Sequence, residues 1–473
     1  SYSVTGVQTC ALPIWGCVNE VARRVQASHP DEWIGALAYW EYAYWPEGID
    51  LAPNVWVQTC LHTRNWWSPS MEANDRRVLS EWRNNRPGKP LYVWLYYNFP
   101  ALNAQSEDFG YFPGFNGHQV VEQMALYREN DVTGIFMEHS SEFGQSFLMD
   151  QVEFYVSLKL ADDPTLDGKA LIDEFFRLYY GAAAKPMQTL YEAIEDVYTD
   201  PENYPDEVRA TNKHYHQSEE FAWRYLGTPE RMAEYAELME EARASASTPL
   251  EQARVAAFDE GIWHQMVDGR AKWEEKKEAK ARPAPEAVVP ATKPAGGDPD
   301  GVAFSSAIEL APWYTLGGLD TERQITARAL HDGEYLYLQL EEAVELARLK
   351  EGPRVWDGDD FEIFLATEKT GPVLQVIVGP TGALTAALNN PNPLGAKTAT
   401  RASLAASDAA NWRVRLAIPL AEVPGFKSDS TRDLWANCCR ASSGASALLA
   451  WSPTHVGRFC EPAKFGRLTL EGD

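Results

Sequence analysis

The sequence is poor in positive charge, in cysteine and in long apolar runs. Its 473 residues contain 42 Lys and Arg against 68 Asp and Glu, which gives a formal net charge of −26 at pH 7. Nucleic acids and anionic membrane surfaces are bound through basic surfaces, so this charge balance argues against both as partners. No run of eighteen or more apolar residues occurs, and the sequence therefore predicts no membrane-spanning helix.

The six cysteines show no Cys-x-x-Cys spacing, so the sequence predicts no zinc or redox motif. Cys460 pairs with Cys438 or Cys439 in one alternative, and all three are free buried thiols in the other. His214 and His216 are two residues apart and do not share a helix face, which argues against a metal site there.

Aromatic residues are abundant, with 17 Trp, 21 Tyr and 18 Phe. Flat aromatic rings stack on sugar rings, but they also fill ordinary protein cores. The composition is therefore compatible with a carbohydrate-binding protein without requiring one.

Four short apolar runs, each followed by aromatic or polar residues, predict four buried strands at 33–39, 55–60, 91–97 and 135–137. Helical patterns at 75–83 and 120–130 lie between these runs, and another follows at 147–160. Strands that alternate with helices predict a parallel sheet, whose chemistry would collect at the carboxyl ends of the strands. We interpret residues 15–165 as the C-terminal half of a truncated (β/α)8 TIM-type barrel. Residues 1–14 resemble a translated sequencing adaptor and are excluded as an artefact.

The rest of the chain predicts three further segments. Residues 166–280 carry helical periodicity with mixed charge on the polar faces, which predicts an α-helical bundle. Residues 281–300 are rich in Pro and Ala and predict a semi-rigid linker. From 301 to 473 the apolar period changes to two, with Gly and Pro turns between short runs, which predicts an antiparallel β-sandwich. The chain is therefore expected to be a multidomain protein.

Several motifs in the first part of the chain resemble the domain of unknown function 4838, also classed as glycoside hydrolase family 163. They include Asn19-Glu-Val-Ala22, Leu91-Tyr-Val-Trp-Leu-Tyr-Tyr-Asn98, Asp131-Val-Thr-Gly134 and Tyr179-Tyr-Gly-Ala182. The resemblance spans about residues 15 to 200. It implies a (β/α)8 barrel and a retaining endo-β-N-acetylglucosaminidase-like activity on glycans, without a cofactor. It also implies an extracellular or periplasmic location. The alternative is a non-catalytic carbohydrate-binding or cell-surface protein.

Glycoside hydrolysis needs two acidic groups near the scissile bond. Glu138 and Glu41 follow the last and the first predicted strands and are the candidate catalytic residues. For Glu138, capping of the next helix or pairing with a nearby Arg is the structural alternative. Seven further side chains are candidates for stacking on sugar rings or bonding their hydroxyl groups: Tyr39, Trp40, His62, Trp94, Tyr97, Asn98 and His139.

The C-terminal part resembles the carbohydrate-binding family 9-like sandwiches through motifs such as Trp435-Ala-Asn-Cys-Cys-Arg440 and Trp451-Ser-Pro453. Trp356, Asn437, Arg440 and Trp451 are the predicted sugar contacts, and a purely structural sandwich is the alternative. Asp357, Asp359 and Asp360 could bind Ca²⁺ as hard oxygen ligands, although an Asp-rich turn needs no metal. The sequence does not indicate the oligomeric state.

Overall fold

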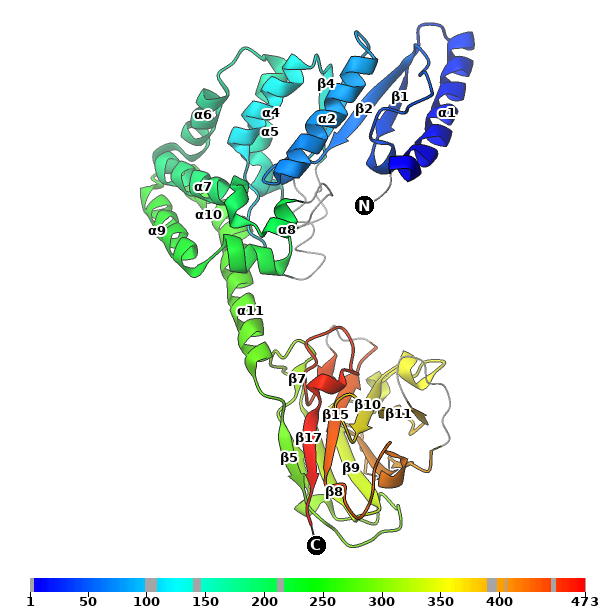
Figure 1. Cartoon of the computed structure of the whole chain (residues 1–473). Coiled ribbons are helices and arrows are strands. Elements are labelled where there is room, and N and C mark those ends of the chain that lie inside the picture. The colour runs from blue at the N-terminus through cyan, green and yellow to red at the C-terminus, as the bar shows by residue number, and fades with distance from the viewer. Residues whose placement is uncertain are drawn as a thin grey trace. The chain divides into compact units, whose positions relative to one another are not determined.

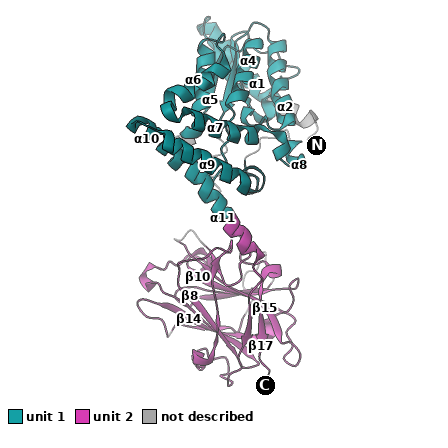
Figure 2. Cartoon of the chain, turned by 90° about the vertical axis from the view of Figure 1, so that its left-hand side faces the viewer, with its two compact units in different colours: residues 1–273 teal, residues 274–473 magenta. Residues whose placement is uncertain are grey.

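The computed structural model describes residues 4–97, 109–138, 146–210, 217–388, 398–404, 406–443 and 448–472, without the side chains of 4–11 and 146–147. The chain divides into two compact units, residues 1–273 and 274–473 (Figure 2). In the described stretches no helix combines the length and the apolar character that crossing a membrane requires.

Unit 1 begins with a parallel sheet in which the strands follow one another in chain order. Its strands are β1 (Ile34–Ala38), β2 (Val55–Leu61), β3 (Leu91–Tyr96) and β4 (Gly134–Glu138) (Figure 1). The four strands predicted from the apolar runs are confirmed. The flanking helices are α1 (Val4–Ser28), α2 (Pro69–Asn85), α4 (Gly117–Glu129) and α5 (Gln151–Asp162), with 3-10 turns η1 (Trp40–Tyr42), η2 (Thr63–Asn65) and η3 (Ser146–Asp150).

Among the described residues of unit 1, helices cover the strands on one face only, which differs from the expectation that both faces are buried. Val55, Val57 and Leu61 of β2 share one core with Leu79 of α2 and Val156 of α5. The alternate residues of each strand point to the opposite face, as the strand period of two requires. On that face Phe136 of β4 is 45% exposed.

The helical part of unit 1 continues the same core. Its helices are α6 (Gly168–Tyr180), α7 (Ala184–Thr199), α8 (Asp206–Arg209), α9 (Pro229–Ser245), α10 (Pro249–Phe258) and α11 (His264–Ala281), with π-helical turns at Phe221–Leu226 and Asp259–Trp263. A single cluster of buried apolar residues extends from Trp15 to Met266. The predicted boundary at residue 165 therefore does not separate two cores.

Unit 2 is a sandwich of two mainly antiparallel sheets, as predicted. One sheet has the order β12-β11-β10-β15-β16-β7, with β17 beside β15 and β5 beside β17, and the other has the order β13-β14-β9-β8-β6. The strands are β5 (Glu286–Val289), β6 (Ile308–Leu310), β7 (Tyr314–Thr315), β8 (Ile325–His331), β9 (Tyr335–Glu342), β10 (Asp360–Ala366), β11 (Leu374–Val378), β12 (Leu384–Leu388), β13 (Arg401–Ser403), β14 (Trp412–Pro419), β15 (Asp433–Ala441), β16 (Leu449–Ala450) and β17 (Gly466–Leu470). The core between the sheets includes Leu338, Ile363 and Trp412.

The prediction of a semi-rigid linker over 281–300 is wrong for residues 286–289. These residues form β5, which pairs in parallel with β17 from Arg467 to Leu470. The Pro and Ala residues around it suggested a linker, but β5 obtains its backbone partners from a segment about 180 residues later in the chain. Such pairing leaves no local signature.

Candidate functional site

The open face of the four-stranded sheet is lined with aromatic rings. Trp56 of β2 and Tyr92 of β3 lie with ring centroids 4.7 Å apart, and Trp94 of β3 and Phe136 of β4 lie 4.1 Å apart. Trp56, Tyr92 and Trp94 are half-buried. The period of two places these side chains on the face that the helices do not cover.

Glu138 ends β4 at the carboxyl edge of this face. Its Oε2 accepts a hydrogen bond of 2.9 Å from Trp94 Nε1, and the carboxylate is half-buried. Tyr96 is its register partner on β3 and lies in hydrogen-bond contact with Cys60 of β2. Burial, with a further contribution from the Glu138 charge, raises the pKa of the Cys60 thiol to about 11. Cys60 therefore stays protonated at neutral pH and is not a nucleophile.

Three further predicted residues gather around Tyr96 at this edge. His62 stacks on the Tyr96 ring with centroids 5.6 Å apart, and Tyr39 lies 6.4 Å from it. Trp40 packs edge-on against Tyr39 and is 67% exposed. Its backbone has φ +52°, a left-handed conformation that is costly for a bulky residue.

The buried Asp75 of α2 fixes the backbone on which His62 lies. Its Oδ2 accepts hydrogen bonds of 2.8 Å from the His62 backbone N–H and 3.0 Å from Trp66 Nε1. Burial raises the pKa of Asp75 to about 7, and the two hydrogen bonds oppose that rise.

The two predicted catalytic carboxylates come from opposite ends of the sheet. Glu41 is exposed on η1, just beyond β1, whereas Glu138 ends β4. Three strand spacings of about 4.8 Å set an upper limit of about 14 Å on the separation of the β1 and β4 backbones. A retaining glycosidase needs its two carboxyl groups about 5–5.5 Å apart. A pair of Glu41 and Glu138 would therefore require both side chains to extend toward each other.

Tyr97 lies on the other side of the sheet and is wrongly predicted as a sugar contact. It is completely buried among the helix-facing residues, one position beyond Tyr96, which points to the open face. Asn98 and His139, the two remaining candidates, fall outside the residues that the structure describes.

Tyr97 belongs to a buried polar cluster that the sequence did not reveal. The Arg64 guanidinium of η2 pairs with Asp150 and donates a bond of 2.8 Å to the Gly114 carbonyl oxygen. Glu153 accepts hydrogen bonds from Tyr191 at 2.8 Å and from the Asn116 backbone N–H at 2.9 Å. Burial raises the pKa of Asp150 to about 6 and that of Glu153 to about 8, while the Arg64 charge opposes both shifts.

This cluster ties the end of β2 to η3 and α5, next to the carboxyl edge of the sheet. Arg64 and Asp150 are 86 residues apart in sequence, so spacing could not link them. Acidic residues among the buried apolar positions of α5, such as Glu153 beside Val152 and Val156, are the one available signal.

In unit 2, two of the predicted sugar contacts are buried structural groups. Arg440 is 1% exposed and bonds Glu342 at 2.7 Å and Asp359 at 2.9 Å. The Asn437 side chain exchanges two hydrogen bonds with the Ser452 backbone, at 2.8 and 3.0 Å. Neither side chain is accessible to a sugar. Trp356 is half-buried under the Arg354 guanidinium, 5.0 Å from its ring centroid.

The three aspartates proposed for Ca²⁺ are directed to different partners. Asp357 pairs with Arg354, whereas Asp359 binds Arg440 and Ser443. Burial raises the pKa of Asp360 to about 8, so its carboxyl group is largely protonated at neutral pH. Among the described residues no group of three or more Asp, Glu, His or Cys side chains is arranged to hold a metal. The cysteines of unit 2 are free thiols.

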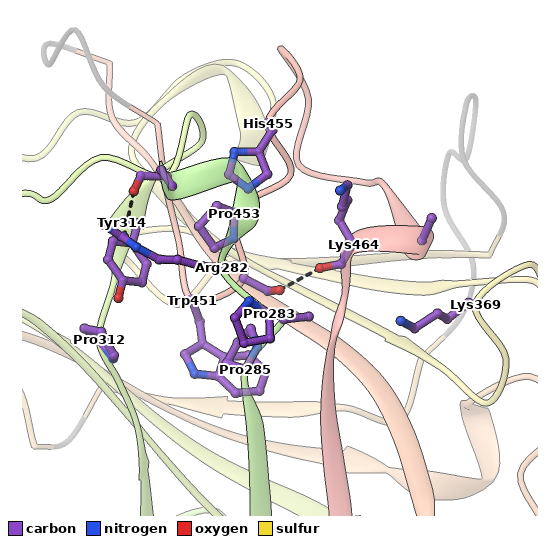
Figure 3. A pocket seen from close by; sticks show the side chains of 15 residues that line it. Arg282, Pro283, Pro285, Pro312, Tyr314, Lys369, Trp451, Pro453, His455 and Lys464 are labelled. Carbon is purple, nitrogen blue, oxygen red and sulfur yellow. Dashed lines mark hydrogen bonds between the residues drawn. The ribbon is translucent and has the colours of Figure 1, made fainter. Parts of the chain in front are cut away.

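Trp451, the fourth predicted contact, lies in a pocket of about 270 Å³ in unit 2 (Figure 3). Three segments of the chain and Lys369 form its wall. The lining residues are Ala279, Arg282, Pro283, Ala284, Pro285, Pro312, Tyr314, Gly318, Lys369, Trp451, Ser452, Pro453, His455, Ala463 and Lys464. Trp451 itself is 2% exposed and contributes to the floor of the pocket.

Comparison with known proteins agrees with the resemblance of the first part of the chain. Residues 11–192 match the family described as "Domain of unknown function (DUF4838)". No curated protein matches the chain.

Among solved structures, a candidate carbohydrate-binding protein from Bacteroides uniformis ATCC 8492 is 17% identical, with 40% of this chain and 100% of that chain covered and a TM-score of 0.31. A family 9 carbohydrate-binding module from Caldicellulosiruptor kristjanssonii, solved with cellotriose, is 16% identical over 40% and 94% of the two chains, with a TM-score of 0.31. The same module solved with glucose is 16% identical, with 40% of this chain and 96% of that chain covered and a TM-score of 0.30. At this level of identity these structures do not define a ligand for this chain.

Proposed function

We propose that this protein acts on glycans, and that the carboxyl edge of the four-stranded sheet is the site in unit 1. The observation that carries the proposal is Glu138, a half-buried carboxylate held by Trp94 Nε1 beside Tyr96, whose ring in turn contacts Tyr39 and His62. A carboxyl group protonates or positions the reacting sugar, and aromatic rings bind its apolar face.

In this proposal the four parallel strands correspond to an arc of a (β/α)8 barrel, in which reactive groups lie at the carboxyl ends of the strands. The activity that the family resemblance implies is a retaining endo-β-N-acetylglucosaminidase. Glu138 then serves as the acid or as the group that orients the acetamido substituent. Such an enzyme meets its glycans outside the cytoplasm.

A second candidate function is binding of glycans without hydrolysis. It is favoured by the positions of Glu41 and Glu138, which follow the two end strands of the sheet rather than neighbouring strands. The two functions share the aromatic face and differ in what Glu138 does.

The test compares the whole chain with its Glu138→Gln variant on an N-glycan that contains a chitobiose core. Glu41→Gln is the matched control, since Glu41 is exposed and remote from β4. Release of reducing sugar that is lost in Glu138→Gln and kept in Glu41→Gln, with glycan affinity retained in both, would establish the hydrolase. Glycan binding without turnover by the unmodified chain would establish the second function. If a folded chain showed no glycan binding and no turnover, the proposal would be refuted.

A further inference from the structure

The pocket of unit 2 is basic in a strongly acidic protein. Of its fifteen described lining residues, four are basic (Arg282, Lys369, His455 and Lys464) and none is Asp or Glu. The chain as a whole has 68 acidic and 42 Lys and Arg residues, so its average composition would place more carboxylates than cations in such a lining. Figure 3 shows Arg282, His455 and Lys464 around the pocket, with Trp451, Pro283, Pro285 and Pro312 lower in the view.

Arg282 is held in place without being neutralised by a buried carboxylate. Its guanidinium lies 4.7 Å from the Tyr314 ring centroid, and Nη1 donates a hydrogen bond of 3.0 Å to the Gly318 carbonyl oxygen. The acidic group nearest to it in an ion pair is Asp320, at 3.9 Å with 84% of that side chain exposed. Contacts of this kind between exposed charges are weak. The positive charge of Arg282 therefore remains available to an anion.

His455 lines the pocket from a left-handed backbone position. Its φ is +58°, a conformation in which His occurs more often than most non-glycine residues, and the ring Nδ1 lies 3.1 Å from the Gly317 carbonyl oxygen. Burial and the charges of Lys464, Lys280 and Arg282 lower the pKa of His455 below its usual value, and the bond to Gly317 opposes them. Three cations therefore lie close enough to this imidazole to act on its charge.

We propose that this pocket binds one acidic sugar residue, carboxylated or sulfated, of a glycan. The proposal rests on the proposed glycan-directed function and names the substrate class of a second site. Lys369, Lys464 and Arg282 would pair with the anionic group, since charge-assisted hydrogen bonds to carboxylate and sulfate are the strong ones. Tyr314 and the prolines provide apolar surface for the ring, and the buried Trp451 supports the floor beneath them. A volume of about 270 Å³ lies just below the usual range of about 300–1,000 Å³ for small-molecule sites and suits about one sugar ring.

The affinity of this pocket for an acidic sugar should also depend on pH and salt. An anion favours the protonated form of His455, so affinity should increase as the pH falls through the lowered pKa of that residue. Lys464, Lys280 and Arg282 are the charged groups that act on His455. Affinity should fall as the ionic strength rises, because the site is open to solvent on one side and added salt screens its charges.

The test is calorimetric titration of the whole chain at low salt with a glucuronate-terminated disaccharide, its sulfated counterpart, the neutral glucose-terminated counterpart and sodium sulfate. Lys464→Gln is the pocket variant and Lys427→Gln the control, because both lysines are exposed in unit 2 and only Lys464 lines the pocket. We expect at least one acidic sugar to bind at least tenfold more tightly than the neutral one, and Lys464→Gln to weaken that binding about fivefold or more. The carboxylated and sulfated arms show which anionic group is preferred.

Equal affinity for acidic and neutral sugars, or an equal loss in the Lys427→Gln control, would overturn the proposal. If sulfate alone bound as tightly as the acidic sugars, the pocket would be a plain anion site and the proposal would be overturned. A folded chain that bound none of these ligands would overturn it too. Glu138→Gln lies in unit 1 and should leave this affinity unchanged. Failure of glycan turnover is therefore distinguishable from failure of this site.

Discussion

Replacement of Arg440 by Met separates a structural role of this residue from the sugar-binding role predicted from the sequence. The guanidinium is 1% exposed, bonds Glu342 at 2.7 Å and Asp359 at 2.9 Å, and lies 4.8 Å from the Trp412 ring centroid. Met has a similar length and keeps the packing against the ring, but it leaves both carboxylates without this partner. Glu342 keeps Arg323 as a partner, and Asp359 keeps the Lys350 N–H and Ser443.

Breaking a buried ion pair by removing one partner typically costs about 3–5 kcal/mol, because a charge remains buried without compensation. Unit 2 comprises residues 274–473, and for a domain of that size each kcal/mol shifts Tm by about 2–4 °C. Because the two carboxylates keep their other partners, we expect a cost near the lower end of this range, about 3 kcal/mol. The Tm of unit 2 should therefore decrease by about 6–12 °C. Differential scanning calorimetry of the whole chain measures it.

Arg458→Met is the matched control in the same unit. Arg458 is 71% exposed in its pair with Glu461, and such surface pairs contribute at most about 1 kcal/mol. A decrease below about 2 °C for Arg440→Met, combined with loss of sugar binding, would contradict the structural role and restore the original prediction. Similar effects of both substitutions would show that burial of the Arg440 network does not determine stability.

Three other predictions follow from unit 1. The pKa of Glu153 is raised to about 8 in the folded state, so its contribution to stability is fully present below its unfolded pKa of about 4.5 and is lost as the pH rises to about 8. The free energy of unfolding of Glu153→Gln, measured in urea relative to the unmodified chain, should therefore increase by about 3–4 kcal/mol between pH 5 and 8, at about 1.4 kcal/mol per pKa unit. A difference between the two proteins that stays constant over this range would exclude titration of the buried Glu153. Trp40→Ala should weaken glycan binding at least fivefold while changing stability by less than about 0.5 kcal/mol, because this ring is 67% exposed; unchanged affinity in titration would remove Trp40 from the site. Phe136→Glu on the end strand β4 should reduce self-association in light scattering, because apolar edge strands promote it; equal association of the two proteins would show that this edge is not the contact.

The sequence by itself determined the element types in the parts where the apolar period is regular. Runs such as 91–97 predicted the parallel strands, and alternation in segments such as 412–418 predicted the sandwich, because periodicity is set by local backbone geometry. It also placed Glu138 at the end of a strand, among aromatic residues, and the structure has it there.

Only the tertiary structure decided which of these side chains can act. Tyr96 and Tyr97 are adjacent in sequence, yet one faces the open side of the sheet and the other lies in the helix core, because successive residues of a strand point to opposite faces. Arg440 and Asn437 match a sugar-binding pattern, but their partners Glu342 and Ser452 come from other strands and loops and bury them.

The basic pocket shows most directly that sequence patterns do not reveal which distant residues come together. Arg282 comes from a stretch predicted to be a linker, Tyr314 from an edge strand, and His455 and Lys464 from a loop about 170 residues later. Each residue has no distinctive spacing of its own. Their convergence follows from the pairing of β5 with β17 and of β7 with β16, which depends on long-range backbone hydrogen bonds rather than on any local pattern.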